Sequence, residues 1–106
     1  MTEAELLAEI DKLCEQLGLH YVHHPDSRRV HGRGWPDLTI LGPRGALFRE
    51  CKSANGTLRP DQRKVGSWLT GAGLDWAVWR PVTLLTGVIE QQLRRIAKDC
   101  NATTQA

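Results

Sequence analysis

Apolar residues at helical spacing mark the first element of the chain. Thr2, followed three residues later by Glu5, forms the pattern of a helix-capping box, and Gly18 is typical of a helix end. These signals predict a helix over residues 3–17 with one apolar face. The face is formed by Leu6, Leu7, Ile10, Leu13, Cys14 and Leu17.

Shorter apolar runs bounded by turn residues follow this helix, and they predict strands. The segment Gly42-Pro43-Arg44-Gly45, between two of them, is typical of a β-hairpin turn. Polar, Gly-rich stretches on either side of the hairpin predict loops. The predicted strands cover residues 19–24, 38–41 and 46–52, and the loops cover residues 25–34 and 53–58.

The remainder of the chain predicts a helix over residues 60–69, with Pro60 at its first position, and a strand over residues 76–80. A final helix is expected over residues 83–98, and residues 99–106 are expected to form a flexible tail. The order is αβββαβα, which predicts an α/β fold with a small mixed β-sheet flanked by helices.

Composition and length limit the classes of protein to consider. A chain of 106 residues suits a single domain, here expected over residues 1–98. No apolar run approaches the roughly 20 residues of a membrane span, and the acidic N-terminus does not resemble a signal or transit peptide. Three widely spaced cysteines, Cys14, Cys51 and Cys100, do not form a disulfide framework. A cytoplasmic location is therefore expected.

The net charge of +2 conceals an asymmetry along the chain. Residues 1–17 hold five acids and one base, whereas the remaining 89 residues hold 13 Lys or Arg and 7 Asp or Glu, a balance of +6. A basic body suits a polyanionic partner such as nucleic acid.

The hairpin predicts a cluster of charged side chains at one end of the sheet. If Leu41 pairs with Ala46 across the turn, the same register brings Asp37 opposite Glu50. Because side chains alternate along a strand, Lys52 shares the face of Glu50. The sequence therefore places two carboxylates and an ammonium together.

Opposed carboxylates repel one another unless a cation neutralises them. Oxygen ligands suit Mg²⁺, with Mn²⁺ as a substitute, and both bind phosphate oxygens. Lys52 beside such an ion would stabilise negative charge that develops on a phosphate. The simpler alternative is an ion pair between Lys52 and one acid on a solvated sheet edge.

Two further polar residues are expected at the same place. Glu3 begins the apolar stripe of the first helix, so its side chain should face the sheet, although an acid that only favours the helix dipole is the alternative. Gln62 lies in the first turn of the helix over residues 60–69, where a helix N-terminus favours a nearby phosphate.

Several short segments stand in a distinctive order along the chain. They are Gly34-Trp35-Pro36-Asp37-Leu38, Phe48-Arg49-Glu50-Cys51-Lys52-Ser53, Gly56 to Leu58, Pro60-Asp61-Gln62 and Trp79-Arg80-Pro81. Together they resemble the virus-type replication-repair nuclease (VRR-NUC) domain, a branch of the PD-(D/E)XK nuclease superfamily, over roughly residues 2–97.

This resemblance implies a restriction-endonuclease-like core and Mg²⁺-dependent hydrolysis of DNA phosphodiesters. It further implies branched substrates such as Holliday junctions, a homodimer, and a bacterial or phage-infected host cell. By position, Asp37, Glu50 and the Cys51 carbonyl would hold the metal, with Glu3 nearby as a ligand or in support. Lys52 and Gln62 would complete the catalytic set. Alternatives are a nickase or general endonuclease without junction preference, and a catalytically silent DNA-binding module.

The remaining polar residues are less specific. Arg28, Arg29 and Arg33 lie in a loop just before Asp37, where they would grip the phosphate backbone or simply form a flexible basic loop. The four histidines fit no standard zinc pattern. Arg49 falls on the back face of its strand, where burying a charge is costly, and the sequence offers no account of it. Four tryptophans and the flank of the last helix favour an interface between two copies.

Overall fold

The structure, a computed structural model, describes residues 1–24 and 33–98. Four strands form one mixed sheet in the order β1-β2-β3-β4, in which only β4 runs parallel to its neighbour. The predicted α/β class, a small mixed sheet flanked by helices, is confirmed. The elements are α1 (Glu3–Leu17), β1 (His20–His23), β2 (Leu38–Gly42), β3 (Gly45–Cys51), α2 (Pro60–Gly71), β4 (Trp76–Trp79), α3 (Pro81–Leu85) and α4 (Val88–Ile96).

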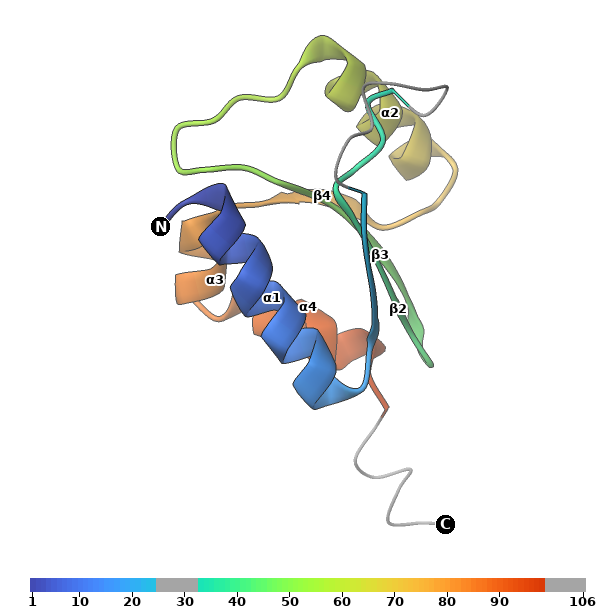
Figure 1. The fold of residues 1–106 in the computed structure, drawn as a ribbon. Helices are drawn as coiled ribbons and strands as arrows, with labels where there is room; N and C mark the ends of the chain where they lie inside the picture. Colours follow the sequence, from blue (N-terminus) through green and yellow to red (C-terminus); the bar gives the residue numbers. More distant parts are fainter. Residues whose placement is uncertain (25–32, 99–106) are drawn as a thin grey trace.

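The helices lie on both faces of the sheet (Figure 1). α1, α3 and α4 cover one face, and α2 lies against the other. The main core fills the space between the sheet and the larger helical layer. It includes Leu6 and Ile10 from α1, Ile40 and Leu47 from the hairpin, and Leu93 from α4, all of them fully buried.

Helix α1 has the bounds and the caps that the sequence predicts. The Glu5 backbone N–H donates to Thr2 Oγ1 at 3.1 Å, and the Thr2 N–H donates to Glu5 Oε1 at 2.9 Å. Gly18 ends the helix with a φ of 71°, a left-handed conformation that costs glycine little. The capping box therefore fixes the end of α1 at which Glu3 lies.

The prediction of one C-terminal helix over residues 83–98 is wrong. α3 ends at Leu85, α4 begins at Val88, and Gly87 between them has a φ of 82°. The apolar spacing from Leu85 to Ile89 continues across the break, so periodicity alone did not reveal it. The glycine turn redirects the chain, and the element order becomes αβββαβαα.

The predicted hairpin register is confirmed. Leu41 pairs with Ala46, and Thr39 pairs with Phe48. Pairing also continues one step further toward the turn, to Gly42 and Gly45, so both strands are longer at this end than expected.

Arg49 is only 1% exposed, and the structure supplies the account that the sequence lacked. Its guanidinium donates to the Asp75 carbonyl at 2.6 Å, to Asp75 Oδ1 at 3.0 Å and to Gln92 Oε1 at 2.9 Å. It also lies 5.1 Å from the centre of the Trp79 ring. Burial lowers the pKa of Arg49, and Asp75 opposes that shift. Asp75 just before β4, Trp79 in β4 and Gln92 in α4 thus satisfy a charge on the back face of β3.

Several large apolar side chains lie on the surface. Trp68 is 63% exposed, Val82 61% and Leu85 76%. Leu84, by contrast, packs partly against the core. No helix within residues 1–24 and 33–98 is long and apolar enough to cross a membrane. The homodimer remains a prediction, and the exposed side chains on α2 and α3 are available to it.

Candidate functional site

The end of the hairpin away from the turn brings the two predicted carboxylates together. Asp37 directly precedes β2, whose pairing with β3 ends at Leu38 and Arg49, so Glu50 is the next position in the same register. The Asp37 carboxylate is held in place, since Oδ2 accepts a hydrogen bond of 2.9 Å from the Cys51 backbone N–H. The side chain of Asp37 therefore spans the gap between the two strands beside Glu50.

Glu50 is 2% exposed, and its carboxylate is incompletely satisfied. Oε1 accepts a hydrogen bond of 2.9 Å from Gln62 Nε2, but no donor in the described chain reaches Oε2. Burial, together with hydrogen bonding and repulsion from Asp37, raises the pKa of Glu50 to about 9, against weaker opposition from Lys52 and Arg59. Without a cation at this site, Glu50 is therefore protonated at neutral pH.

The side chain of Gln62 contacts the Glu50 carboxylate, as its expected place in the site allows. Its Oε1 accepts the Arg59 backbone N–H at 2.9 Å, which leaves Nε2 to donate to Glu50. Its side chain is 4% exposed, so this orientation is fixed by packing as well. Gln62 thus joins the start of α2 to the end of β3.

Lys52 follows β3, on the face of Glu50, and its charge influences Glu50 and Glu3. It forms no ion pair with a described residue, so the simple edge ion pair expected as the alternative is not formed. Its aliphatic stem packs under the next loop, because a Cβ added at Gly56 would lie 3.5 Å from Lys52 Cβ and Cδ. The ammonium is consequently available to a ligand.

Arg80 holds that loop in place, a role that the sequence did not reveal. Its Nη1 donates to the Ser53 carbonyl at 2.8 Å and to the Gly56 carbonyl at 2.7 Å. The Lys52 backbone N–H also donates to the Trp79 carbonyl at 3.0 Å. β4 and Arg80 together therefore fix the backbone on both sides of the Lys52 side chain. The signal for this role was the position of Arg80 in the Trp79-Arg80-Pro81 segment.

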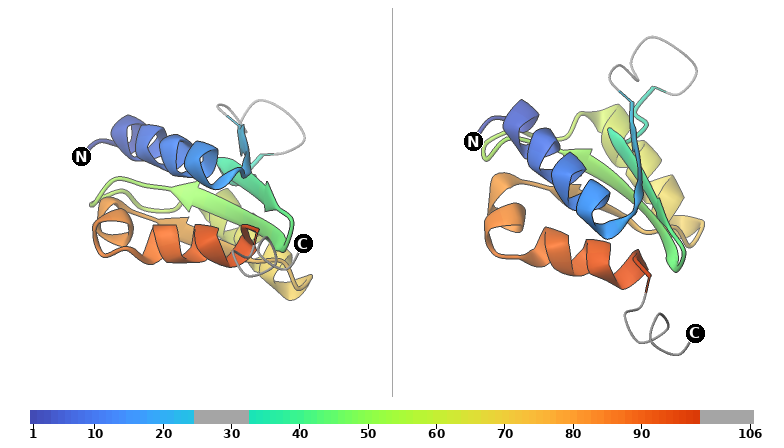
Figure 2. Two further views of the ribbon diagram at one scale, coloured as in Figure 1. Left: turned by 90° about the horizontal axis from the view of Figure 1, so that it is seen from below. Right: turned by 60° about the horizontal axis from the view of Figure 1, so that its bottom comes forward.

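The start of α1 lies beside the segment that follows β3 (Figures 1 and 2), and Glu3 is the first residue of that helix. Partial burial and the negative charge of Asp37 raise its pKa, while Lys52 and His23 oppose that shift. Glu3 is exposed and makes no hydrogen bond to Asp37 or Glu50. It is therefore placed as an outer member of the acidic group.

The Cys51 side chain points away from the cluster into the core, where it is fully buried. Burial, with the negative charge of Asp37 beside it, raises the pKa of its thiol, so the thiol is neutral and unreactive. What Cys51 offers the site is its backbone, whose N–H binds Asp37.

The loop arginines are only partly described. Arg28 and Arg29 lie outside the described residues. Arg33 is exposed, and its Nε lies 3.3 Å from Asp61 Oδ2 at the start of α2. Gly34 packs closely on the same turn, because a Cβ there would lie 2.4 Å from the Asp61 carbonyl oxygen. Arg33 is thus tethered to α2 next to the cluster.

His24, which directly follows β1, contacts the residues on either side of the start of β2. Its backbone N–H donates to the Asp37 carbonyl at 2.7 Å, and its Nε2 lies 3.2 Å from Thr39 Oγ1. Among residues 1–24 and 33–98, no three His, Cys, Asp or Glu side chains are grouped closely enough to hold a metal ion on their own. The histidines therefore join no group of three metal-binding side chains in the described chain.

The Asp37 and Glu50 pair still fits a divalent cation that takes its other ligands from main-chain oxygen and water. When both are ionised, these two carboxylates, one of them with a buried oxygen that has no donor in the described chain, form an acceptor-only set. Hard cations such as Mg²⁺ commonly bind through one or two carboxylates and keep several waters. A cation would also remove the repulsion that raises the pKa of Glu50.

Comparisons with protein families, with curated proteins and with solved structures found no match to this chain.

Proposed function

We propose that the protein is a Mg²⁺-dependent DNA endonuclease with a restriction-endonuclease-like core of the VRR-NUC type, and that Asp37 and Glu50 bind its metal. The observation that supports this most directly is the pair itself. A buried glutamate with one unsatisfied oxygen lies beside a second carboxylate, next to a lysine without an ion-pair partner in the described chain. Such an arrangement is unfavourable without a cation and is suited to phosphate chemistry with one.

Each residue then has a separate role. Asp37, Glu50 and the Cys51 carbonyl would hold Mg²⁺, or Mn²⁺ in its place, with Glu3 nearby. When bound, the metal supplies charge neutralisation and lowers the pKa of water at the site. Lys52 stabilises the negative charge that develops on the phosphate during attack by water. Gln62 keeps the Glu50 carboxylate oriented through its 2.9 Å hydrogen bond.

The substrate is proposed to be DNA, preferably branched, cut by a homodimer with one site in each copy. Arg28, Arg29 and Arg33 would contact the backbone beside the cut. A nickase or general endonuclease uses the same chemistry without selecting a branch. A silent DNA-binding module would not need the Asp37, Glu50 and Lys52 set.

The test is the variant Asp37→Asn, which removes a charge but keeps an oxygen that can accept the Cys51 N–H. It should abolish cleavage in Mg²⁺ while leaving the fold intact by circular dichroism. Glu9→Gln, in a surface ion pair with Lys12, is the matched control and should cleave like the wild type. Substrates should include a four-way junction, a flap and plain duplex, each with Mg²⁺ and with chelator. Near wild-type cleavage by Asp37→Asn would refute the site, and equal rates on all substrates would favour the general endonuclease.

A further inference from the structure

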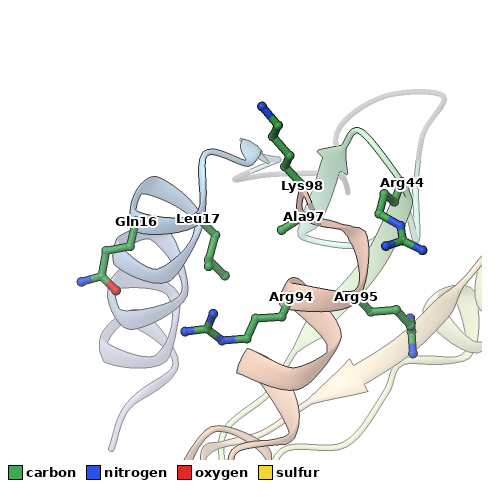
Figure 3. Close-up of a pocket in the computed structure, with 7 residues that line it drawn as sticks. All are labelled: Gln16, Leu17, Arg44, Arg94, Arg95, Ala97 and Lys98. Atoms are coloured by element: carbon green, nitrogen blue, oxygen red, sulfur yellow. The ribbon is translucent and has the colours of Figure 1, made fainter. Parts of the chain in front are cut away.

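A hollow of about 480 Å³ lies at the turn of the β2–β3 hairpin (Figure 3), whereas the carboxylate pair lies at the other end of that hairpin. The C-terminal ends of α1 and α4 and the turn of the β2–β3 hairpin surround the hollow. Four of its seven lining residues are cationic and none is acidic. We call it the distal basic hollow, and it is lined by Gln16, Leu17, Arg44, Arg94, Arg95, Ala97 and Lys98.

The distal basic hollow is separate from the candidate active site. Helix α1 connects the two regions, with Glu3 at the end beside the carboxylates and Gln16 at the hollow. At 1.5 Å per residue, the 13 steps between them span about 20 Å. That distance corresponds to roughly six base pairs of duplex, at 3.4 Å for each.

Arg94, Arg95 and Lys98 of the hollow are exposed and available to a polyanion. Arg94 pairs with Glu90 at 3.1 Å and Arg95 with Asp75 at 2.7 Å, but the two arginine side chains are 60% and 58% exposed and their acidic partners 47% and 44%. Exposed ion pairs of this kind contribute little, so phosphates can replace their acidic partners. Lys98 is exposed and forms no ion pair within the described chain.

The position of the cations argues against a purely structural role. Basic residues in the last turn of a helix offset its dipole, which accounts for Arg94 and Arg95. It does not account for Arg44 in the hairpin turn or for Lys98 beyond the end of α4. Cations from two segments of the chain therefore gather around the same hollow.

Their spread also indicates the kind of ligand. Figure 3 shows Arg94 extending toward α1, whereas Arg95 and Arg44 lie on the other side of α4 and Lys98 points outward. The four groups do not converge on one point, as they would around a single small anion. They suit a row of negative charges, which a nucleic-acid strand presents about every 3.4 Å along its axis.

We infer that the distal basic hollow binds the phosphate backbone of duplex nucleic acid beyond the point of cleavage. This inference rests on the proposed function for the identity of the polymer. It gives the protein a second contact, far from the carboxylates, that holds substrate without taking part in the reaction.

The test compares two double variants that remove equal charge. Arg94→Gln with Lys98→Gln removes two of the four positive charges of the hollow. Arg95 is left unchanged, because its partner Asp75 also binds the buried Arg49. Lys12→Gln with Lys64→Gln is the matched control outside the hollow. Binding to a duplex of about 30 base pairs is measured by fluorescence anisotropy in chelator over a range of salt concentrations, since log affinity falls with log salt by about 0.9 for each phosphate contact.

The hollow variant should bind roughly tenfold more weakly at low salt, and its salt slope should fall by about 2, whereas the control keeps the wild-type slope. Its kcat in Mg²⁺ at saturating duplex should match the wild type. Unchanged binding by the hollow variant, or an equal loss in both variants, would overturn the inference even if the wild type cleaves DNA. Binding of inorganic phosphate to the hollow at micromolar concentration would also overturn the inference, in favour of a small-anion site. A wild type that binds through the hollow but never cleaves would instead refute the nuclease assignment alone.

Discussion

Replacing Glu50 with glutamine should stabilise the metal-free protein, by an amount that grows with pH. The amide has the shape of the carboxylate and can still accept the hydrogen bond from Gln62 Nε2. The amide is neutral, so its burial does not require a charge to be desolvated, and its NH₂ group can donate to Asp37. The variant therefore removes the repulsion at the site without opening a cavity.

The pKa shift sets the direction and the size of this effect. Burial and Asp37 raise the pKa of Glu50 from 4.5 to about 9 in the folded protein. The stability that its proton provides is fully present below the unfolded pKa of about 4.5 and is lost as pH rises toward 9. Over that window the wild type should lose up to about 1.4 kcal/mol per pH unit relative to Glu50→Gln, or roughly 3 kcal/mol between pH 5 and pH 7.

The assay is urea unfolding of both proteins in chelator, at about pH 5, 7 and 9, since the midpoint and slope give the free energy of unfolding. The difference between the two proteins cancels the titration of the groups that do not interact with Glu50. Glu9→Gln again serves as the control and should track the wild type. Adding Mg²⁺ at about pH 8 should stabilise the wild type, by about 2.7 kcal/mol at a hundred times its dissociation constant, and leave Glu50→Gln unchanged.

Parallel stability curves for the wild type and Glu50→Gln across this pH range would refute the reasoning, because Glu50 would then titrate in the folded protein as it does in the unfolded chain. Stabilisation of Glu50→Gln by Mg²⁺ equal to that of the wild type would show that Glu50 is not a metal ligand.

The other predictions concern catalysis, DNA binding and assembly. Lys52→Ala should lower kcat far more than DNA affinity, and an equal fall in affinity would make Lys52 only a phosphate contact. Arg80→Met should lower kcat roughly tenfold, because Arg80 anchors the loop beside Lys52, and an unchanged kcat would remove Arg80 as a positioning residue. Replacing Arg28, Arg29 and Arg33 with alanine should weaken DNA binding and reduce its salt slope by up to about 3, and an unchanged slope would exclude the loop from the interface. Light scattering at micromolar concentration should report twice the 11.9 kDa chain mass, whereas a monomer with and without DNA would remove the junction-resolving arrangement and leave a nickase or flap-type nuclease.

The sequence by itself determined the elements whose signals are local. The capping box of Thr2 and Glu5 fixed the start of α1, and the Gly42 to Gly45 turn fixed the register of the hairpin. From that register alone followed the approach of Asp37 and Glu50, because residues opposite one another on antiparallel strands must share a face. The candidate site was therefore readable where its members lie on two adjacent strands joined by a short turn.

Only the tertiary structure decided how distant segments complete that site. Glu50 depends on Gln62 from α2, the loop beside Lys52 depends on Arg80, and the buried Arg49 depends on Asp75 and Gln92. Such pairings join residues that local periodicity does not relate, since they arise only once helices pack on the sheet. The distal basic hollow has the same origin, because its cations come from a hairpin turn and a helix end that meet only in the folded chain.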